Sequence, residues 1–144
     1  VVTSPPFGER GCTRLAMDPG RRVARHESDL GLEDWISACI SFLAPGGSLT
    51  LVVQETRRSK AADVLNVSLP TLRILPLVSR SGLPPKRVIL QGWAVQARQK
   101  VVYPPLLLHP DRGKGYTHTV ESILRRGRKL LDMSAPLVVS SSRV

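Results

Sequence analysis

The 144-residue sequence predicts an α/β fold in which a mostly parallel sheet carries an antiparallel edge hairpin. Two observations support this prediction. In the first half of the chain, strand-like apolar runs flank a segment with clear helical periodicity, which is typical of parallel strands joined by a helix. In the second half, two strand-like runs are separated only by turn-forming residues, which favours antiparallel pairing.

The first predicted element is the end of a buried strand. Val1–Thr3 is rich in β-branched residues and leads directly into Ser4-Pro5-Pro6-Phe7, which cannot continue a strand. Because a domain rarely begins at the end of a strand, we expect part of the fold to lie upstream of Val1.

A helix is predicted next, because apolar residues recur at steps of three and four on one face. They are Leu32, Trp35, Ile36, Cys39, Ile40 and Leu43. Ser28 or Asp29 is expected to cap the start of this helix, and Pro45-Gly46-Gly47 to end it. Ser48–Val53 then reads as a strand covered on both faces. Strand, helix and strand together predict a βαβ unit.

The remaining elements are shorter. Arg57–Leu65 predicts a second helix, with Ala61, Ala62, Val64 and Leu65 facing inward. Leu72–Val78 and Arg87–Val95 predict the antiparallel pair, at the edge of the sheet. Leu106–Leu108 is a further apolar run. Thr117 is expected to cap a last helix that carries Val120, Ile123 and Leu124.

The charge of the chain favours a polyanionic partner. The formal net charge is +10, and nucleic acid is the commonest partner of such a protein, with an anionic membrane surface as the alternative. No apolar run approaches the length that spans a bilayer. Cys12 and Cys39 read as reduced cytoplasmic thiols. His109 and His118 have no partners at metal-ligand spacing, so we predict no metal site.

The chemistry is predicted at Ser4-Pro5-Pro6-Phe7. Methylation of an exocyclic amino group needs two hydrogen-bond acceptors that aim the nitrogen lone pair at the methyl donor. The Ser4 hydroxyl and the Pro5 carbonyl can accept, the prolines hold the backbone rigid, and the Phe7 ring can stack on a flipped-out base. Such a run is usually only a turn, but its position after a strand, where α/β sheets bind ligands, favours a site.

This run is similar to the fourth motif of amino-methyltransferases, (Asn/Asp/Ser)-Pro-Pro-(Tyr/Phe/Trp). Between Val1 and about Leu124, the chain resembles the bacterial tRNA-valine adenine-N6 methyltransferases. The matching segments, in order, are Arg25-His26-Glu27, Leu32-Glu33-Asp34, Leu43–Gly47, Arg80-Ser81-Gly82, Arg87–Leu90, Pro104–Leu108 and Tyr116-Thr117. The resemblance implies the C-terminal half of a Rossmann-like class I methyltransferase, which uses S-adenosyl-L-methionine and methylates adenine N6 in tRNA.

Two departures from the family pattern are informative. The family usually has Asn where this chain has Ser4, a residue that related cytosine and adenine methyltransferases accept. The glycine-rich loop and the acidic residue that hold the cofactor in this superfamily are not found. Residues 1–131 are therefore expected to be the C-terminal part of a methyltransferase domain without its cofactor-binding part, and residues 132–144 a flexible tail. Alone, such a chain would be marginally stable and inactive.

The predicted catalytic residues are therefore Ser4, Pro5, Pro6 and Phe7. The residues predicted to bind the RNA substrate are Arg10, Arg14, Arg25, Arg80 and Lys86. A solvated loop is the alternative for the arginines after the motif. For Arg125–Lys129 a solvated helix end is favoured, and RNA contact is the alternative. Two functional alternatives stay open. One is an inactive remnant that binds RNA without specificity, and the other is methylation of a cytosine amino group or a protein glutamine.

Overall fold

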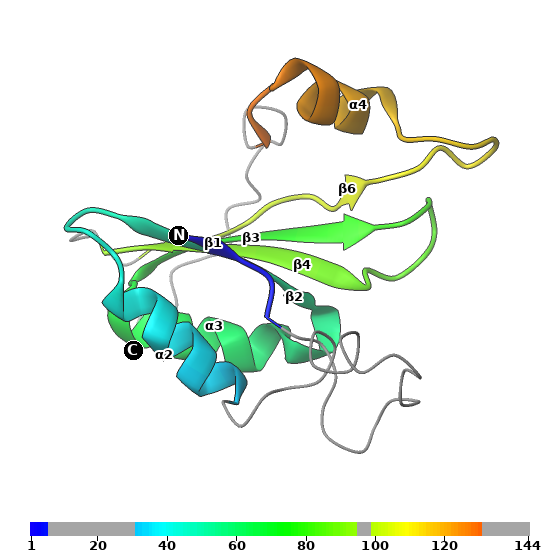
Figure 1. Ribbon diagram of the computed structural model, residues 1–144. Helices are drawn as coiled ribbons and strands as arrows, with labels where there is room; N and C mark the ends of the chain where they lie inside the picture. Colours follow the sequence, from blue (N-terminus) through cyan, green and yellow to red (C-terminus); the bar gives the residue numbers. More distant parts are fainter. Residues whose placement is uncertain (6–30, 95–98, 131–144) are drawn as a thin grey trace, which may run out of the picture.

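The computed structural model describes residues 1–5, 31–94 and 99–130. Within these ranges a single mixed sheet packs with helices, so the predicted α/β class is confirmed (Figure 1). The elements are β1 (Val2–Thr3), α2 (Leu32–Ser41), β2 (Ser48–Gln54), the 3-10 helix η1 (Glu55–Arg57), α3 (Arg58–Ser68), β3 (Thr71–Val78), β4 (Arg87–Trp93), β5 (Gln99–Val102), β6 (Leu106–Leu107) and α4 (His118–Arg126).

The strand order is β1-β2-β4-β3-β5, and β6 also pairs with β3. β4 is antiparallel to both of its neighbours, and every other described pair is parallel. The predicted antiparallel pairing of β3 with β4 is confirmed, but its predicted position at the edge is wrong. β4 lies inside the sheet, because it forms backbone hydrogen bonds with β2 on one side and with β3 on the other. The other side of β3 pairs with β5 and β6.

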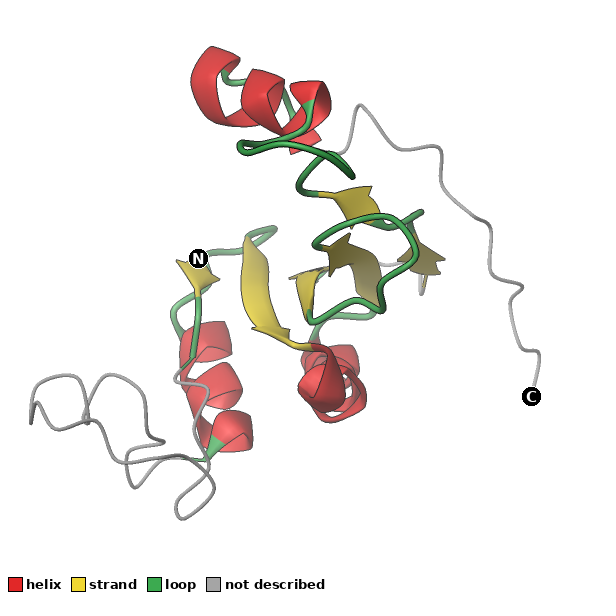
Figure 2. Ribbon diagram, turned by 90° about the vertical axis from the view of Figure 1, so that its right-hand side faces the viewer, coloured by secondary structure: helices red, strands yellow, loops and turns green. Residues whose placement is uncertain are grey.

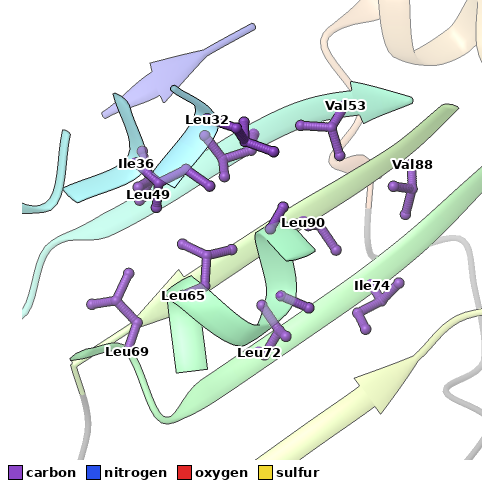
Figure 3. Packing of buried hydrophobic residues seen from close by; sticks show 13 residues of the cluster. Leu32, Ile36, Leu49, Val53, Leu65, Leu69, Leu72, Ile74, Val88 and Leu90 are labelled. Atoms are coloured by element: carbon purple, nitrogen blue, oxygen red, sulfur yellow. The ribbon is translucent and has the colours of Figure 1, made fainter. Parts of the chain in front are cut away.

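Helices α2 and α3 cover one face of the sheet and enclose the core (Figure 3). The predicted apolar face of α2 is confirmed, with Leu32 and Ile36 buried and Cys39, Ile40 and Leu43 packed around them. The N-cap is Gly31, with no side-chain hydrogen bond, and not Ser28 or Asp29, which lie outside the described residues. In α3, Ala61, Ala62 and Leu65 are buried as predicted.

The other face of the sheet is less covered. Leu49, Leu51 and Val53 of β2 are fully buried, whereas the β2 residues between them are only half-buried. The expectation that this strand is covered on both faces is therefore wrong for the described chain. The open face carries a pocket of about 470 Å³ lined by Thr50, Arg73, Leu75, Ile89, Gln91, Lys129 and Leu130.

Helix α4 lies on the side of the sheet away from α2 and α3 (Figures 1 and 2). Thr117 caps it as predicted, because its Oγ1 accepts a hydrogen bond from the Val120 N–H at 3.4 Å. Thr117 Oγ1 also donates to the Leu107 carbonyl at 2.9 Å, which ties the start of α4 to β6. Of the apolar residues that this helix carries, Val120 is buried and Leu124 is 63% exposed.

Candidate functional site

The parallel strands bring most of the described candidate residues to one edge of the sheet. β1, β2, β3 and β6 run in the same direction, so their carboxyl ends meet at that edge. Ser4-Pro5 follows β1, Glu55 follows β2, and Arg80 lies in the turn after β3. Lys86 reaches the same edge because it immediately precedes the antiparallel β4. In open α/β sheets this is the edge at which ligands bind.

Ser4 is positioned by the pairing of β1 with β2. The Thr50 N–H donates to the Val1 carbonyl at 2.9 Å, and the Ser4 hydroxyl donates to the Val52 carbonyl at 3.4 Å. Ser4 is exposed, and Pro5 is buried. A hydroxyl that donates to the backbone keeps its lone pairs for a second partner, so Ser4 Oγ is free to accept a hydrogen bond from a bound amino group.

The strand that leads to Ser4 is not buried, contrary to our expectation. Val1 is 47% exposed and Val2 is 79% exposed, because β1 is the edge strand of the described sheet and pairs only with β2. Its end is nevertheless held from the helical side. The Trp35 indole N–H donates to Thr3 Oγ1 at 3.2 Å, which anchors α2 to the residue just before Ser4.

The other predicted residues near the motif lie outside the described residues. These are Pro6, Phe7, Arg10, Arg14 and Arg25. The stacking role of Phe7 and the RNA contacts of the three arginines therefore stay predictions.

Glu55 is a candidate that the sequence reasoning missed. Its Oε1 pairs with Arg58 at 3.0 Å, whereas its Oε2 is buried with no hydrogen-bond partner in the described part of the chain. Its backbone N–H donates to the Lys86 carbonyl at 3.1 Å, which fixes it at the strand edge. A buried carboxylate oxygen without a partner is costly, so it marks a position where a ligand N–H would be stabilised. The signal in the sequence is an acidic residue directly after a buried strand.

Arg80 is held by protein groups. Its guanidinium donates to the Pro110 carbonyl and, at 3.2 Å, to the Gly113 carbonyl. Beside it, the Ser81 N–H donates to Asp111 Oδ1 at 3.1 Å. These contacts join the turn after β3 to the loop after β6. Lys86, in contrast, has an exposed side chain, as direct contact with RNA requires.

Replacing Arg80 by alanine is expected to loosen the loop after β6. Two charge-assisted hydrogen bonds are lost, and we expect the free energy of unfolding to fall by about 2–3 kcal/mol. Amide hydrogen exchange should rise in residues 109–117. The control is Lys86→Ala, which removes an exposed cation at the same edge and should change neither quantity. Equal effects of the two substitutions would show that Arg80 does not hold the loop.

Other kinds of site find little support in the described ranges. They contain no group of three or more His, Cys, Asp or Glu side chains that could hold a metal ion. They also contain no helix long and apolar enough to cross a membrane. Cys39 is a free thiol. Burial raises the pKa of this thiol, so it stays protonated at neutral pH.

Comparison with known proteins supports the sequence resemblance. The chain is 32% identical over 95 residues to the tRNA1(Val) (adenine(37)-N6)-methyltransferase of Aeromonas hydrophila subsp. hydrophila, which is 63% of this chain and 38% of that protein. Proteins of the same name from Aeromonas salmonicida and Bacteroides fragilis are 30% and 26% identical, each over 62% of this chain and 38% of the relative. The chain thus spans about two fifths of the length of these relatives.

A solved structure agrees in fold. The crystal structure of a predicted O-methyltransferase from Agrobacterium tumefaciens matches with a TM-score of 0.58 at 22% identity, over 63% of this chain and 44% of that one. No protein-family model matches the chain. Over about three fifths of its length, the sequence of the chain is thus similar to bacterial proteins named tRNA1(Val) (adenine(37)-N6)-methyltransferase.

Proposed function

We propose that the protein containing this chain is a methyltransferase that methylates the exocyclic N6 of an adenine in tRNA. The observation that carries the proposal is the position of Ser4-Pro5 at the edge where the parallel strands of the sheet end, in a chain whose relatives are named tRNA1(Val) (adenine(37)-N6)-methyltransferase. The net charge of +10 suits an RNA substrate better than a protein one. Such an enzyme would work in the cytoplasm.

Ser4 and Pro5 would orient the amino group. Ser4 Oγ and the Pro5 carbonyl each accept one amino hydrogen, which draws the nitrogen toward tetrahedral geometry and directs its lone pair away from these two acceptors, toward the methyl donor. Pro5 is buried, its own ring restricts its φ, and the proline that follows restricts its ψ, so the direction of its carbonyl is set before the substrate arrives. The methylated nitrogen then loses its proton to water, and the chain needs no general base for this step.

S-adenosyl-L-methionine would supply the methyl group as an electrophilic carbon on a sulfonium sulfur. Among the described strand ends, the loop after β6 carries Gly113 and Gly115, but its carbonyls are bound by Arg80 and His109, so we do not assign the cofactor site to the described residues. We propose that residues 1–131 act as the C-terminal part of a methyltransferase domain and residues 132–144 as its tail, with the cofactor held by a further part. Two observations support this division. The chain matches only about two fifths of the length of its relatives, and one face of its sheet is only partly covered.

Two experiments test these proposals. In the first, protein expressed from the complete reading frame is incubated with an unmodified valine tRNA transcript and radiolabelled S-adenosyl-L-methionine, and the nucleosides are identified by mass spectrometry. N6-methyladenosine is the expected product. A methylated cytosine or a labelled protein would contradict the adenine target. If the protein binds the RNA but transfers no methyl group, the result would favour the alternative that the protein is an inactive remnant.

In the second experiment, S-adenosyl-L-methionine is titrated into the 144-residue chain in a calorimeter. No heat of binding is expected, because the described strand ends provide no cofactor site. Tight stoichiometric binding would overturn the proposed division of the domain.

A further inference from the structure

The loop after β6, residues 109–116, is closed by contacts at several points. Arg80 and Ser81 hold it from the turn after β3, as described above. Within the loop, His109 Nδ1 lies 2.6 Å from the Gly115 carbonyl, which fixes the tautomer in which Nδ1 carries the proton. At its ends, the Thr117 N–H donates to the Leu108 carbonyl at 2.9 Å. The loop is therefore a pre-formed element.

This closed loop presents positive charge to solvent. Arg112 and Lys114 are exposed and make no hydrogen bond or ion pair with any described residue. Asp111, the acidic residue of the loop, has one carboxylate oxygen engaged by Ser81. A Cβ built on Gly113 or Gly115 would meet nothing within 4 Å, so the backbone beside the two cations is open to a large partner.

The loop also presents an aromatic surface. The rings of His109 and Tyr116 stack with their centroids 5.1 Å apart and their planes 19° from parallel. Tyr116 is 47% exposed, although a tyrosine usually buries much of its ring. Exposed cations next to a stacked aromatic pair are the combination that binds single-stranded nucleic acid, with phosphates on the cations and a base on the ring.

The position of the loop relates it to the candidate site. β6 is parallel to β3, so the loop lies at the same edge as Ser4-Pro5, and Figure 1 shows it beyond the tips of β3 and β6. In the strand order, β6 is four strand spacings from β1, which corresponds to about 19 Å. At this distance the loop cannot contact the nucleotide whose base lies at Ser4. It can contact only other nucleotides of the same RNA.

We propose that residues 109–116 form a rigid docking loop for the RNA substrate, which contacts nucleotides other than the methylated one. Arg112 and Lys114 bind phosphates, and Tyr116 stacks on an unpaired base. Arg80 positions the loop from behind. This proposal rests on the proposed function for the identity of the polyanion as RNA, but the RNA binding that it predicts can be measured without any methyl transfer.

The test is the double variant Arg112→Ala/Lys114→Ala, made in protein from the complete reading frame. Binding of a fluorescent unmodified valine tRNA transcript is measured by anisotropy between 50 and 200 mM salt, without methyl donor. Loss of two phosphate contacts should reduce the slope of log affinity against log salt concentration by about 1.4–1.8. The affinity at 0.1 M salt should fall by roughly 20- to 60-fold. The KM for tRNA should rise more than kcat falls.

The matched control is Arg126→Ala/Arg128→Ala, which removes the same charge at the other end of α4. Its affinity should exceed that of the loop variant at every salt concentration. Equal losses in the two double variants would overturn the proposal, because binding would then follow net charge alone. Thermal unfolding of each variant checks that both remain folded.

Two further measurements separate the possible partners. Tyr116→Ala should weaken tRNA binding, and Tyr116→Phe should preserve it, because only the ring is needed for stacking. The loop variant is also tested on anionic phosphatidylglycerol vesicles. If it loses vesicle binding but keeps tRNA binding, the loop is a membrane contact and the proposal is wrong. If tRNA binding falls as expected while wild-type protein methylates no base, the docking loop stands and the proposed function fails.

Discussion

Replacement of Ser4 by alanine is expected to lower kcat for methyl transfer to tRNA by about 10²-fold, with a smaller change in KM. The Ser4 hydroxyl is exposed at the end of β1 and donates to the Val52 carbonyl, so its lone pairs can receive an amino hydrogen of the base. Removal of one pre-organised hydrogen-bonding group from a reacting centre typically costs about 10²–10³-fold in kcat. Single-turnover kinetics with saturating tRNA measures this loss.

Two control substitutions sharpen the Ser4 experiment. Ser4→Asn restores a side-chain acceptor and should recover most of the activity. Ser41→Ala removes the hydroxyl that donates to the Ala38 carbonyl at the end of α2, and it should leave kcat unchanged. If Ser4→Ala keeps wild-type kcat, the amino group is held by other acceptors, and Glu55 would be the next candidate.

Replacement of Leu90 by alanine is expected to lower the free energy of unfolding by about 2–5 kcal/mol. Leu90 is fully buried in β4, beneath the layer formed by α2 and α3, so its truncation leaves a cavity in the core (Figure 3). Urea unfolding followed by circular dichroism measures the change. If Leu90→Ala proves unfolded in the absence of urea, the volume-conserving Leu90→Met should remain folded, with a loss of less than about 1.5 kcal/mol.

The neighbouring residue provides the matched comparison. Ile89 precedes Leu90 in β4 but points to the opposite, half-open face, where it lines the pocket. Ile89→Ala in the 144-residue chain should therefore cost less than Leu90→Ala. Equal costs would show that the second face is packed as tightly as the first, and would contradict its assignment as an open face.

Local signals in the sequence predicted most single elements correctly. The steps of three and four from Leu32 identified the buried face of α2, and Thr117 was recognised as the cap of α4. These features depend on residues a few positions apart, whose side chains meet on one face or at one helix end whatever the rest of the chain does. β5 was not predicted, because Gln99–Val102 is short and becomes a strand only by pairing with β3.

Of the candidate site, the sequence alone predicted a chemical role for Ser4-Pro5, since the residue types and their position after a strand required no knowledge of distant contacts. Only the tertiary structure decided which other residues lie together at the edge where the parallel strands end. The strand order placed β4 between β2 and β3 and brought Glu55 beside Lys86. It also brought Arg80 to the carbonyls of the loop after β6. These outcomes depend on backbone pairing between segments far apart in the chain, and local residue patterns carry no information about which strands will become neighbours.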